Sequence, residues 1–462
     1  MTSAETFPAS KPTRLDDELH RLNASTTGRL VRPSSAEWDE ARQAWNLSAN
    51  LRPTAVAEVA SVDDVVTVVN LARRIGLRVA PMSTGHNAGA LPNLEGVVLL
   101  KLGALRDVIV DAEERTARAG GGARWSDVIE VAAQHGMAAL GGTSRDVGVA
   151  GYLLGGGMSW LVRSHGPAAD YVTAIELVTA DGRFRRIDAN TEPELFWAVC
   201  GGGGSFGVVT ALEFDLLPIS TVQGGRLLWP IESASQVLHE WQRWIATVPR
   251  EITSVGRLLS FPPLSAIPEA IRGKAFAVIE LVSQLSAERT NELLAPLRAL
   301  SPSTDTVTEL PVSQLWQLHG DPDGPASGTG EGILLDALPA EAVDAMIEAF
   351  QPPLVSFELR HLDGAFASAH GGVVEYPDAD IAAFAAVIVP SPDELEIARL
   401  QVERAVAALT EWAIGRDYLN FAESRKPLDR LFTKEIVDRL RAVRATYDPD
   451  SLILANHNVD PA

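Results

Sequence analysis

Between residues 61 and 80 the spacing of the hydrophobic residues predicts a helix followed by a strand. From residue 61 to residue 76, apolar residues recur three or four positions apart, which is typical of one buried helix face. Ser61 and Asp64 have the spacing of an N-terminal capping box, and Gly76 suits the left-handed position after the helix. The apolar run Leu77–Ala80 then predicts a strand.

A short loop with one histidine follows this strand. The loop is Pro81–Gly89, with His86 near its centre, and the apolar run Gly96–Leu102 predicts the next strand. Glycines and small hydroxyl residues allow the backbone to turn sharply and to direct several N–H groups at one point, which suits a pyrophosphate. The alternative is a surface turn whose histidine has no function.

The same mixture of short strands and helices continues along the chain, without an internal repeat. Asp181-Gly182 predicts the tight turn of a hairpin. We expect strands at 116–119, 174–180, 184–187, 208–217, 275–285, 332–335, 354–362 and 373–376, and helices at 125–135, 194–199 and 286–300. The pattern therefore predicts an α+β protein.

Glycine is concentrated in two stretches, at 141–157 and 201–207. The first has seven glycines among 17 residues, interleaved with valine and leucine, so it is not a flexible linker. Such a stretch allows the backbone to approach a flat ligand closely, where a Cβ atom would collide. The alternative is a glycine-rich helix or turn in a crowded core. Neither the dinucleotide fingerprint nor a Walker A motif is present.

Length and charge narrow the class of protein. A chain of 462 residues predicts more than one domain, and its net charge of −21 argues against nucleic acid or an acidic membrane surface as a partner. Cys200 is the only cysteine, so the chain forms no internal disulfide. The polar N-terminal region lacks the apolar segment of a signal peptide. We expect a cytoplasmic protein with no metal site, and the oligomeric state stays open.

Several motifs, taken together, carry a resemblance to a known family. They are Thr84-Gly-His86, the stretch Val147–Gly157, Val178–Gly182, Glu194–Val199, Gly201–Val209, Tyr418–Phe421, Tyr447-Asp-Pro449 and Asn456–Val459. In this order they resemble the FAD-linked oxidases related to berberine bridge enzyme, in the vanillyl-alcohol oxidase superfamily. The resemblance spans most of residues 50–220 and 415–462.

This resemblance implies a domain organisation and a cofactor. It implies a bipartite FAD-binding domain of two α/β subdomains and a substrate domain whose antiparallel sheet, flanked by helices, covers the flavin. The expected divisions are residues 1–50 for an N-terminal arm and the start of the FAD domain, 51–218 for the FAD domain, 219–416 for the substrate domain and 417–462 for a segment returning to the FAD domain.

The resemblance also implies which residues bind FAD. In the family, the loop containing His86 binds the pyrophosphate, and this histidine bonds covalently to the flavin. The residues expected at the cofactor are His86, Ser83, Thr84, Gly85, Asn87, Gly89, Gly142, Thr143, Ser144, Val147, Gly148, Gly151, Gly155, Gly156, Gly207, Val208, Val209, Asn420, Asn456 and Asn458.

One departure from the family bears on how FAD is attached. Many relatives have a second covalent link through a cysteine, and Ser144 stands at that position here. Serine is a much weaker nucleophile than a thiolate, so we expect one covalent bond, through His86. Cys200 is not expected to replace the missing cysteine.

The catalytic residues are harder to predict. The segment Phe357–Asp363 concentrates titratable groups in an apolar surrounding, and alternation places Glu358 and Arg360 on one face and His361 on the other. Phe421 stands where several relatives have a catalytic tyrosine. The candidates are therefore Tyr418, His361, Glu358 and Arg360, and a solvated edge strand is the alternative for residues 357–363.

The function implied by the resemblance is oxidation of a small organic substrate, namely an alcohol, amine, sugar or natural-product intermediate. Hydride would pass to N5 of the flavin, and O₂ would reoxidise the flavin to give H₂O₂. In relatives the residue at the position of Val147 influences oxygen access. A dehydrogenase with another electron acceptor, and a tailoring enzyme that cyclises or rearranges its substrate, remain alternatives.

Overall fold

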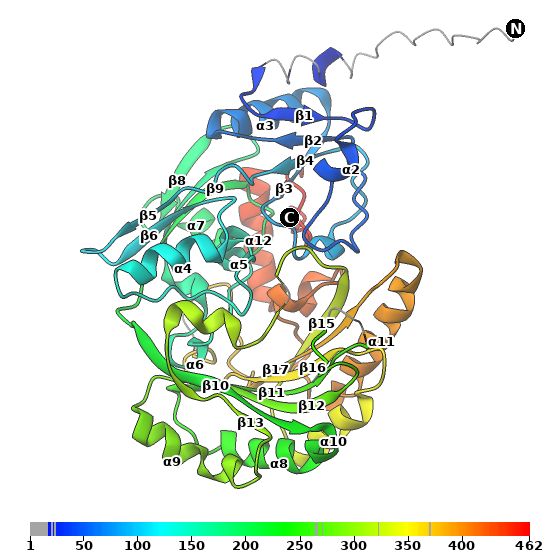
Figure 1. Cartoon of the computed structure of the whole chain (residues 1–462). Coiled ribbons are helices and arrows are strands. Elements are labelled where there is room, and N and C mark those ends of the chain that lie inside the picture. The colour runs from blue at the N-terminus through cyan, green and yellow to red at the C-terminus, as the bar shows by residue number, and fades with distance from the viewer. Residues whose placement is uncertain are drawn as a thin grey trace, which may run out of the picture.

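The computed structural model describes residues 17–19, 22, 25–263, 267–269, 271–321, 323–368 and 371–462. These residues form three β-sheets with helices packed on them, so the expected α+β class is confirmed. Two smaller sheets occupy the upper half of the molecule in Figure 1, and the largest sheet crosses the lower half. No helix within the described ranges is long and apolar enough to cross a membrane.

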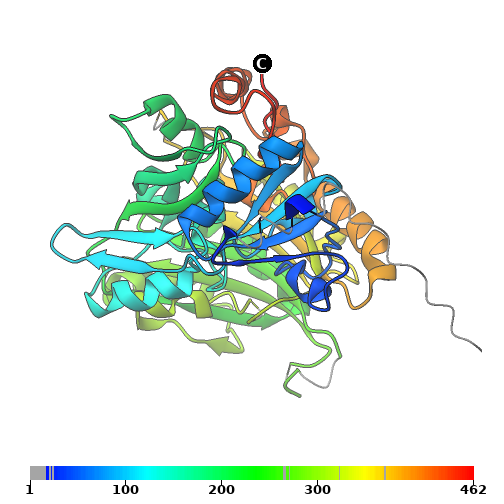
Figure 2. The same ribbon diagram turned by 90° about the horizontal axis from the view of Figure 1, so that it is seen from above.

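The first sheet contains the strand, loop and strand predicted around His86. Its order is β1-β2-β4-β3, with β2, β4 and β3 parallel and β1 antiparallel. The strands are β1 (Arg29–Val31), β2 (Ala55–Glu58), β3 (Arg78–Met82) and β4 (Val97–Lys101), and the short helical segments α2 (Trp38–Ala41) and η1 (Ala88–Ala90) lie close to them. The predicted helix is α3 (Val62–Ile75), which covers this sheet in the view from above (Figure 2).

The N-terminus of α3 is held by two different side chains. Ser61 Oγ accepts a hydrogen bond from Asp64 N, as the capping motif predicts, and Gly76 has a φ of 76°. The carboxylate of Asp64 does not complete a reciprocal box. It accepts hydrogen bonds from the backbone N–H groups of Thr27, Gly28 and Ala60 instead. Burial acts to raise the pKa of Asp64, but these hydrogen bonds outweigh it and lower the pKa.

We predict that Asp64→Ala destabilises the folded protein by about 2–4 kcal/mol, because three backbone donors lose a charged acceptor at a buried site. The measurement is the midpoint of urea unfolding at neutral pH. Asp63→Ala is the matched control, since Asp63 lies in the same helical turn but is exposed. Equal midpoints for the two variants would contradict this view of Asp64.

The second sheet has the order β5-β6-β9-β7-β8 and is antiparallel. Its strands are β5 (Val108–Asp111), β6 (Thr116–Gly120), β7 (Val172–Val178), β8 (Phe184–Asp188) and β9 (Val208–Asp215). The helical segments around it are α4 (Trp125–Gln134), α5 (Val149–Leu154), α6 (Val162–His165), η2 (Ala168–Tyr171) and α7 (Pro193–Val199). The glycine-rich stretch 141–157 is therefore partly helical, as one of its two interpretations required.

The largest sheet has the order β13-β10-β12-β11-β16-β17-β15, and β14 also pairs with β10. Its strands are β10 (Thr221–Pro230), β11 (Ile252–Ser260), β12 (Ala275–Ser283), β13 (Thr304–Asp305), β14 (Thr308–Pro311), β15 (Gly328–Leu335), β16 (Ser356–His361) and β17 (Ile381–Ile388). Its helices are α8 (Ala234–Ile245), α9 (Ala287–Arg298), α10 (Ala340–Ala349) and α11 (Leu395–Ala407), with the short segments η3 (Ile231–Ser233), η4 (Val312–Gln317), η5 (Pro392–Glu394) and η6 (Thr410–Trp412).

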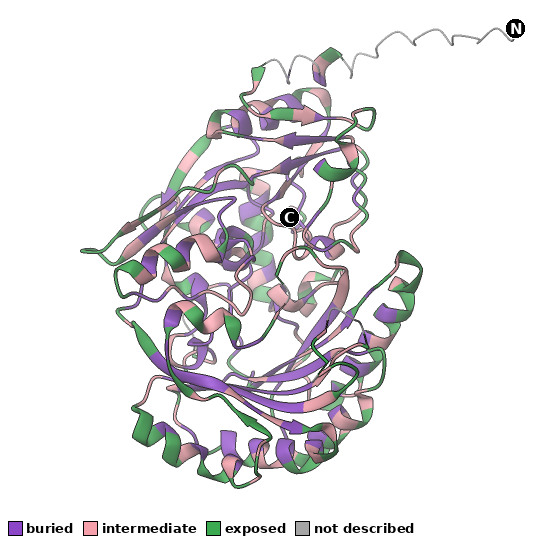
Figure 3. Cartoon of the chain, in the orientation of Figure 1, coloured by how far each residue is buried: buried purple, intermediate pink, exposed green. Residues whose placement is uncertain are grey.

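The two faces of this sheet differ in character. A hydrophobic core lies between one face and helices α8 to α11, and Figure 3 shows buried positions along the strands above these helices. The other face looks toward the two smaller sheets (Figure 1). That second face carries buried charged side chains from β11, β12 and β16. The charged groups expected at the flavin side therefore come from several strands.

The C-terminal segment returns to the first sheet. After η7 (Leu419–Phe421) and η8 (Leu428–Arg430), the chain forms α12 (Lys434–Tyr447) and then pairs Ile453 with Val79 of β3. Figure 1 shows α12, in red, between the blue and green parts of the upper half. This return brings residues 418–423 next to the loop after β3, because Asn87 Nδ2 donates to the carbonyl oxygen of Ala422 at 3.0 Å.

One sequence prediction about local structure is wrong. The predicted strand at 373–376 is irregular. The apolar residues Val373, Val374 and Tyr376 are buried by packing on neighbouring segments without ladder hydrogen bonds. Short apolar runs cannot distinguish these cases, since burial alone sets the pattern.

Candidate active site

The loop after β3 presents buried polar atoms that have no partner. Ser83 Oγ, His86 Nε2 and Asn87 Oδ1 are buried, and none has a hydrogen-bond partner among the described residues. The other ring nitrogen of His86, Nδ1, lies 3.0 Å from Thr84 Oγ1. Buried polar atoms are normally satisfied, so three unpaired atoms in one loop indicate a site for a polar ligand.

Trp45 holds the His86 ring from one side. The two rings are stacked, with centroids 3.9 Å apart and an interplanar angle of 16°. Trp45 Nε1 donates to Asp146 Oδ2 at 3.0 Å, which fixes the indole. Burial is the main cause that lowers the pKa of His86 to about 4, against the opposing effect of the carboxylates of Asp146 and Asp321. The imidazole is therefore neutral at pH 7 and has a nitrogen lone pair.

The glycines between residues 141 and 157 allow two other segments, the loop after β3 and residues 418–420, to approach this stretch. A Cβ atom on Gly148 would lie 2.5 Å from Ser83 Oγ, and one on Gly155 would lie 2.5 Å from Asn420 Nδ2. On Gly156, whose φ is 109°, it would lie 2.9 Å from the Tyr418 hydroxyl. Any larger residue would push these segments apart, so the glycines assemble the site from distant parts of the chain.

Two tyrosine hydroxyl groups lie where the C-terminal segment packs on the glycine-rich stretch. Tyr152 comes from α5 and Tyr418 from the C-terminal segment, and each hydroxyl is buried without a hydrogen-bond partner among the described residues. Asn420 links the same two segments, because its Oδ1 accepts from Gly157 N at 3.0 Å and its Nδ2 donates to Tyr152 O at 3.2 Å. Burial raises the pKa of both tyrosines well above the usual value. They therefore act as hydrogen-bond donors at neutral pH.

A buried ionic network lies on the face of the largest sheet that looks toward these tyrosines. Glu358 and Arg360 of β16 are joined at 2.7 Å, and His319 contacts Glu358 at 2.9 Å and Glu280 at 2.6 Å. Arg257 completes the network at 3.3 Å from Glu280. Burial and Arg257 act to lower the pKa of His319, but Glu280 and Glu358 outweigh them and raise it to about 9. His319 is therefore protonated at neutral pH.

His361 is the last residue of β16. Its Nε2 is 3.0 Å from Asp363 Oδ2, and Arg163 donates to both carboxylate oxygens of Asp363, at 2.8 and 3.1 Å. The Nδ1 atom of His361 is buried and has no partner among the described residues. Burial lowers the pKa of His361, against the effect of Asp363, so the ring is neutral.

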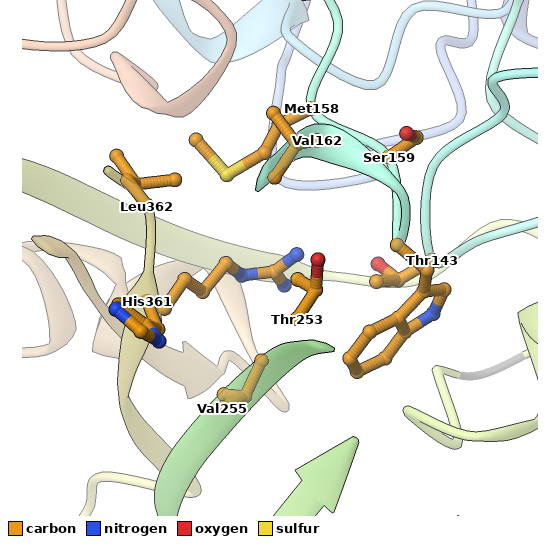
Figure 4. A pocket seen from close by; sticks show the side chains of 10 residues that line it. Thr143, Met158, Ser159, Val162, Thr253, Val255, His361 and Leu362 are labelled. Atoms are coloured by element: carbon orange, nitrogen blue, oxygen red, sulfur yellow. The ribbon is translucent and has the colours of Figure 1, made fainter. Parts of the chain in front are cut away.

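A cavity lies between the two halves of the molecule. Figure 4 shows Met158, Val162 and Leu362 on one side of it, and Thr253 and Val255 on the other. The remaining residues that line it are Thr143, Ser159, Trp160, Arg360 and His361. The cavity thus touches the glycine-rich stretch, β11 and the end of β16, and two of the four catalytic candidates, Arg360 and His361, line it.

Not every predicted cofactor residue lies beside the unpaired atoms. Gly207, Val208 and Val209 lie at the start of β9 in the core against β7, and a Cβ atom on Gly207 would lie 2.9 Å from Leu177 Cδ1. Asn456 and Asn458 make hydrogen bonds within the C-terminal turn. The neighbouring His457 ties this turn to the chain, since its Nε2 lies 2.9 Å from Ala422 O.

Sequence reasoning did not find several members of the site. Tyr152 lies inside the glycine-rich stretch, where a lone polar aromatic residue was a usable signal. Trp45, Arg257, Glu280 and His319 gave no signal, because only the tertiary fold brings them to His86 or Glu358. Within the described part of the chain, no three His, Cys, Asp or Glu side chains are arranged to hold a metal ion.

Comparison with known proteins finds similarity to FAD-linked oxidoreductases. Residues 53–188 match the FAD binding domain family. The chain is 26% identical to the FAD-linked oxidoreductase YgaK of Bacillus subtilis, over 94% of this chain and 97% of that protein. It is also 26% identical to (R)-6-hydroxynicotine oxidase of Paenarthrobacter nicotinovorans, over 95% and 97% of the two chains.

Solved structures agree with these matches in fold. The berberine bridge enzyme-like protein 1 of Physcomitrella patens superposes with a TM-score of 0.84 at 19% identity, over 96% of this chain and 99% of the other. The 6-hydroxy-D-nicotine oxidase of Arthrobacter nicotinovorans gives 0.82 at 23% identity, over 95% and 99%.

Proposed function

We propose that this chain, as an FAD-linked oxidoreductase of the vanillyl-alcohol oxidase superfamily, is an oxidase that acts on a small organic substrate. The electrons of the substrate pass to O₂, which gives H₂O₂. The substrate occupies the cavity lined by the glycine-rich stretch, β11 and the end of β16.

The observation that carries the proposal is that unpaired buried polar atoms lie in the glycine-rich stretch and in both segments that pack against it. Ser83, His86 and Asn87 supply three of them from the loop after β3, Tyr152 supplies one from α5, and Tyr418 supplies one from the C-terminal segment. An FAD molecule offers phosphate oxygens and ring heteroatoms that satisfy such groups. The residues present therefore fit the cofactor that the FAD binding domain implies.

Within this site we assign His86 as the single covalent attachment point. Its pKa of about 4 leaves the imidazole neutral, and Thr84 engages Nδ1, so Nε2 is the nitrogen free to form a bond. The serine at position 144 is too weak a nucleophile to add a second link. FAD, when bound, supplies two-electron oxidation of a C–H bond.

The four catalytic candidates take different tasks in this proposal. Glu358 is a poor proton acceptor, because Arg360 and His319 hold its pKa well below the usual range even though burial opposes them. Its contacts orient Arg360 instead. Tyr418, protonated at neutral pH, donates a hydrogen bond to the bound ligand. His361 alone of the four has an unpaired lone pair on a neutral ring.

We therefore assign His361 as the acceptor of the substrate proton. Asp363 accepts the Nε2–H bond, so Nδ1 carries the lone pair, and Arg163 keeps Asp363 in place. His361→Gln should lower kcat by a factor of roughly 10²–10⁴ and remove the acidic limb of the kcat pH profile, which lies below pH 6.5 in the wild type. An unchanged acidic limb in His361→Gln would assign the proton to another group.

Oxidase activity is tested without knowing the substrate. The purified holoprotein is reduced anaerobically with one equivalent of dithionite per flavin, so that no reductant is left, and mixed with air-saturated buffer, and the return of the flavin absorbance is followed with peroxide formation. An oxidase reoxidises rapidly and yields stoichiometric H₂O₂. Slow reoxidation that an added quinone or dye accelerates would identify a dehydrogenase instead. Turnover with alcohols, sugars, amines and organic acids, analysed by product mass, then separates simple oxidation from cyclisation or rearrangement.

A further inference from the structure

We propose that Arg360 is the binding site for an anionic group of the substrate, so that the substrate is a small organic acid with an apolar body. This inference rests on the proposed function, because it takes the cavity beside Arg360 as the substrate site. It goes further by naming the chemical class that the cavity accepts.

Arg360 is largely buried, held by neighbouring side chains and incompletely paired. Its side chain is 11% exposed, and its Nε donates to Glu358 Oε1 at 2.7 Å. The guanidinium lies over the ring of Phe421, 5.1 Å from the centroid, which fixes its plane. Nη1 makes no hydrogen bond to a described residue, and the Arg360 side chain lines the cavity. A guanidinium has five N–H donors, so donors remain for a ligand.

Arg360 belongs to a network of charged groups that come from several segments of the chain. The buried network contains three cations, Arg257, His319 and Arg360, and two carboxylates, Glu280 and Glu358. Arg360 Nη2 lies 3.3 Å from His319 Nε2, and both groups share the single carboxylate of Glu358.

A third carboxylate, Asp321, lies near the network at 3.9 Å from His319 Nε2. Its side chain is 29% exposed and is also bound by Thr143 Oγ1. Its negative charge nevertheless acts on Arg360, since burial lowers the pKa of Arg360 but Glu358 and Asp321 outweigh it and raise the pKa. A carboxylate placed in the cavity matches the planar fork of the Arg360 guanidinium and would accept hydrogen bonds from its free donors.

The other residues that line the cavity restrict the chemical character of the rest of the substrate. Met158, Val162, Val255 and Leu362 offer apolar contacts, and Thr143, Ser159 and Thr253 offer hydroxyl groups. This lining suits a hydrocarbon or aromatic body that carries one acidic group. It disfavours a protonated amine, which would face Arg360 across a site of low dielectric constant. It also offers few partners for the many hydroxyl groups of a sugar.

Benzoate and benzamide test the proposal on the holoprotein, since they share shape and differ in charge. Binding is followed by the perturbation of the visible flavin spectrum and by titration calorimetry. Hydrogen bonds to charged groups predict that benzoate binds roughly 10- to 100-fold more tightly than benzamide. Equal affinities for the two compounds would overturn the proposal, and so would tighter binding of benzamide.

Variants then assign the effect to Arg360. Arg360→Gln should lose the preference for benzoate, and Arg360→Lys, which keeps the charge but not the fork, should retain part of it. Arg439→Gln is the matched control, because Arg439 also lies over an aromatic ring, that of Trp197, and pairs with Glu194 at the surface. A benzoate preference that survives in a folded Arg360→Gln protein would overturn the assignment.

The test stands apart from the proposed oxidase function. Binding of benzoate needs no turnover, so a protein that selects benzoate but reoxidises slowly would retain the anion site and lose the oxidase assignment. A protein that reoxidises rapidly but shows no benzoate preference would retain the oxidase assignment and lose the anion site.

Discussion

A His86→Ala variant should carry no flavin that stays with the polypeptide after denaturation in SDS. The wild type should show a fluorescent protein band on the gel, since Nε2 of His86 is neutral, buried and unpaired in the folded state. The variant should still bind FAD reversibly, because Ser83, Asn87 and the loop backbone remain. The expected change is complete loss of the fluorescent band with retention of visible flavin absorbance in the native protein.

Two further variants make this prediction specific. Ser144→Ala should leave the fluorescent band unchanged, since serine forms no second link. Trp45→Leu should reduce the fraction of protein with attached flavin, because the imidazole loses the ring that stacks on it at 3.9 Å. Flavin that remains attached in His86→Ala would identify a different residue as the anchor, and a fluorescence loss in Ser144→Ala would mean that this side chain takes part.

The sequence predicted those parts of the fold in which a local pattern and a local signal agree. Helix α3 has one apolar face, a capping serine and a terminal glycine, and it begins and ends where these residues place it. Helix α9 begins after Ser286 for the same reason. Strands β10 and β17 were not predicted. β10 contains Gly224 and Gly225, and β17 is rich in alanine, so neither shows alternation of apolar and polar residues.

The site was predictable only where its residues lie in one stretch. The loop around His86 and the glycine-rich segment each carry their own signature, and the fold brings them together. The residues of the buried ionic network carry no signature within one stretch of sequence. Glu280, His319 and Glu358 are separated by about forty residues each, and their contact depends on strand pairing in the large sheet. A single sequence contains no pattern for such pairing, because register is fixed by the whole sheet.

The buried network should also give the protein a stability that depends on pH. His319 has a pKa raised from 6.5 to about 9, so its contribution is complete below pH 6.5 and is lost as the pH rises through about 9. A shift of this size corresponds to at most roughly 3 kcal/mol. Glu280 and Glu358 have lowered pKa values, and their contribution is present above about pH 4.5 and is lost in acid. Stability from the network is therefore greatest between about pH 5 and 6.5.

His319→Gln should remove the alkaline part of this dependence. The difference between the wild type and this variant in the free energy of unfolding should be largest near pH 6 and should shrink toward pH 9. His86 and His361 have lowered pKa values and act in the opposite sense, but they contribute equally to both proteins. His239→Gln is the control, since His239 pairs with Asp344 at the surface and should change stability little at any pH.

Glu280→Gln should be the most damaging single change in the network. In this variant Glu358 is the one buried carboxylate left to pair with three buried cations, Arg257, protonated His319 and Arg360. Removing one partner of a buried ion pair lowers the free energy of unfolding by about 3–5 kcal/mol. Combining it with His319→Gln removes one cation as well, so the double variant should be more stable than the sum of the two single changes predicts. Urea unfolding of all four proteins at pH 6 gives this coupling, which we expect at about 1–3 kcal/mol. Additive effects would mean that Glu280 and His319 do not stabilise each other's charges.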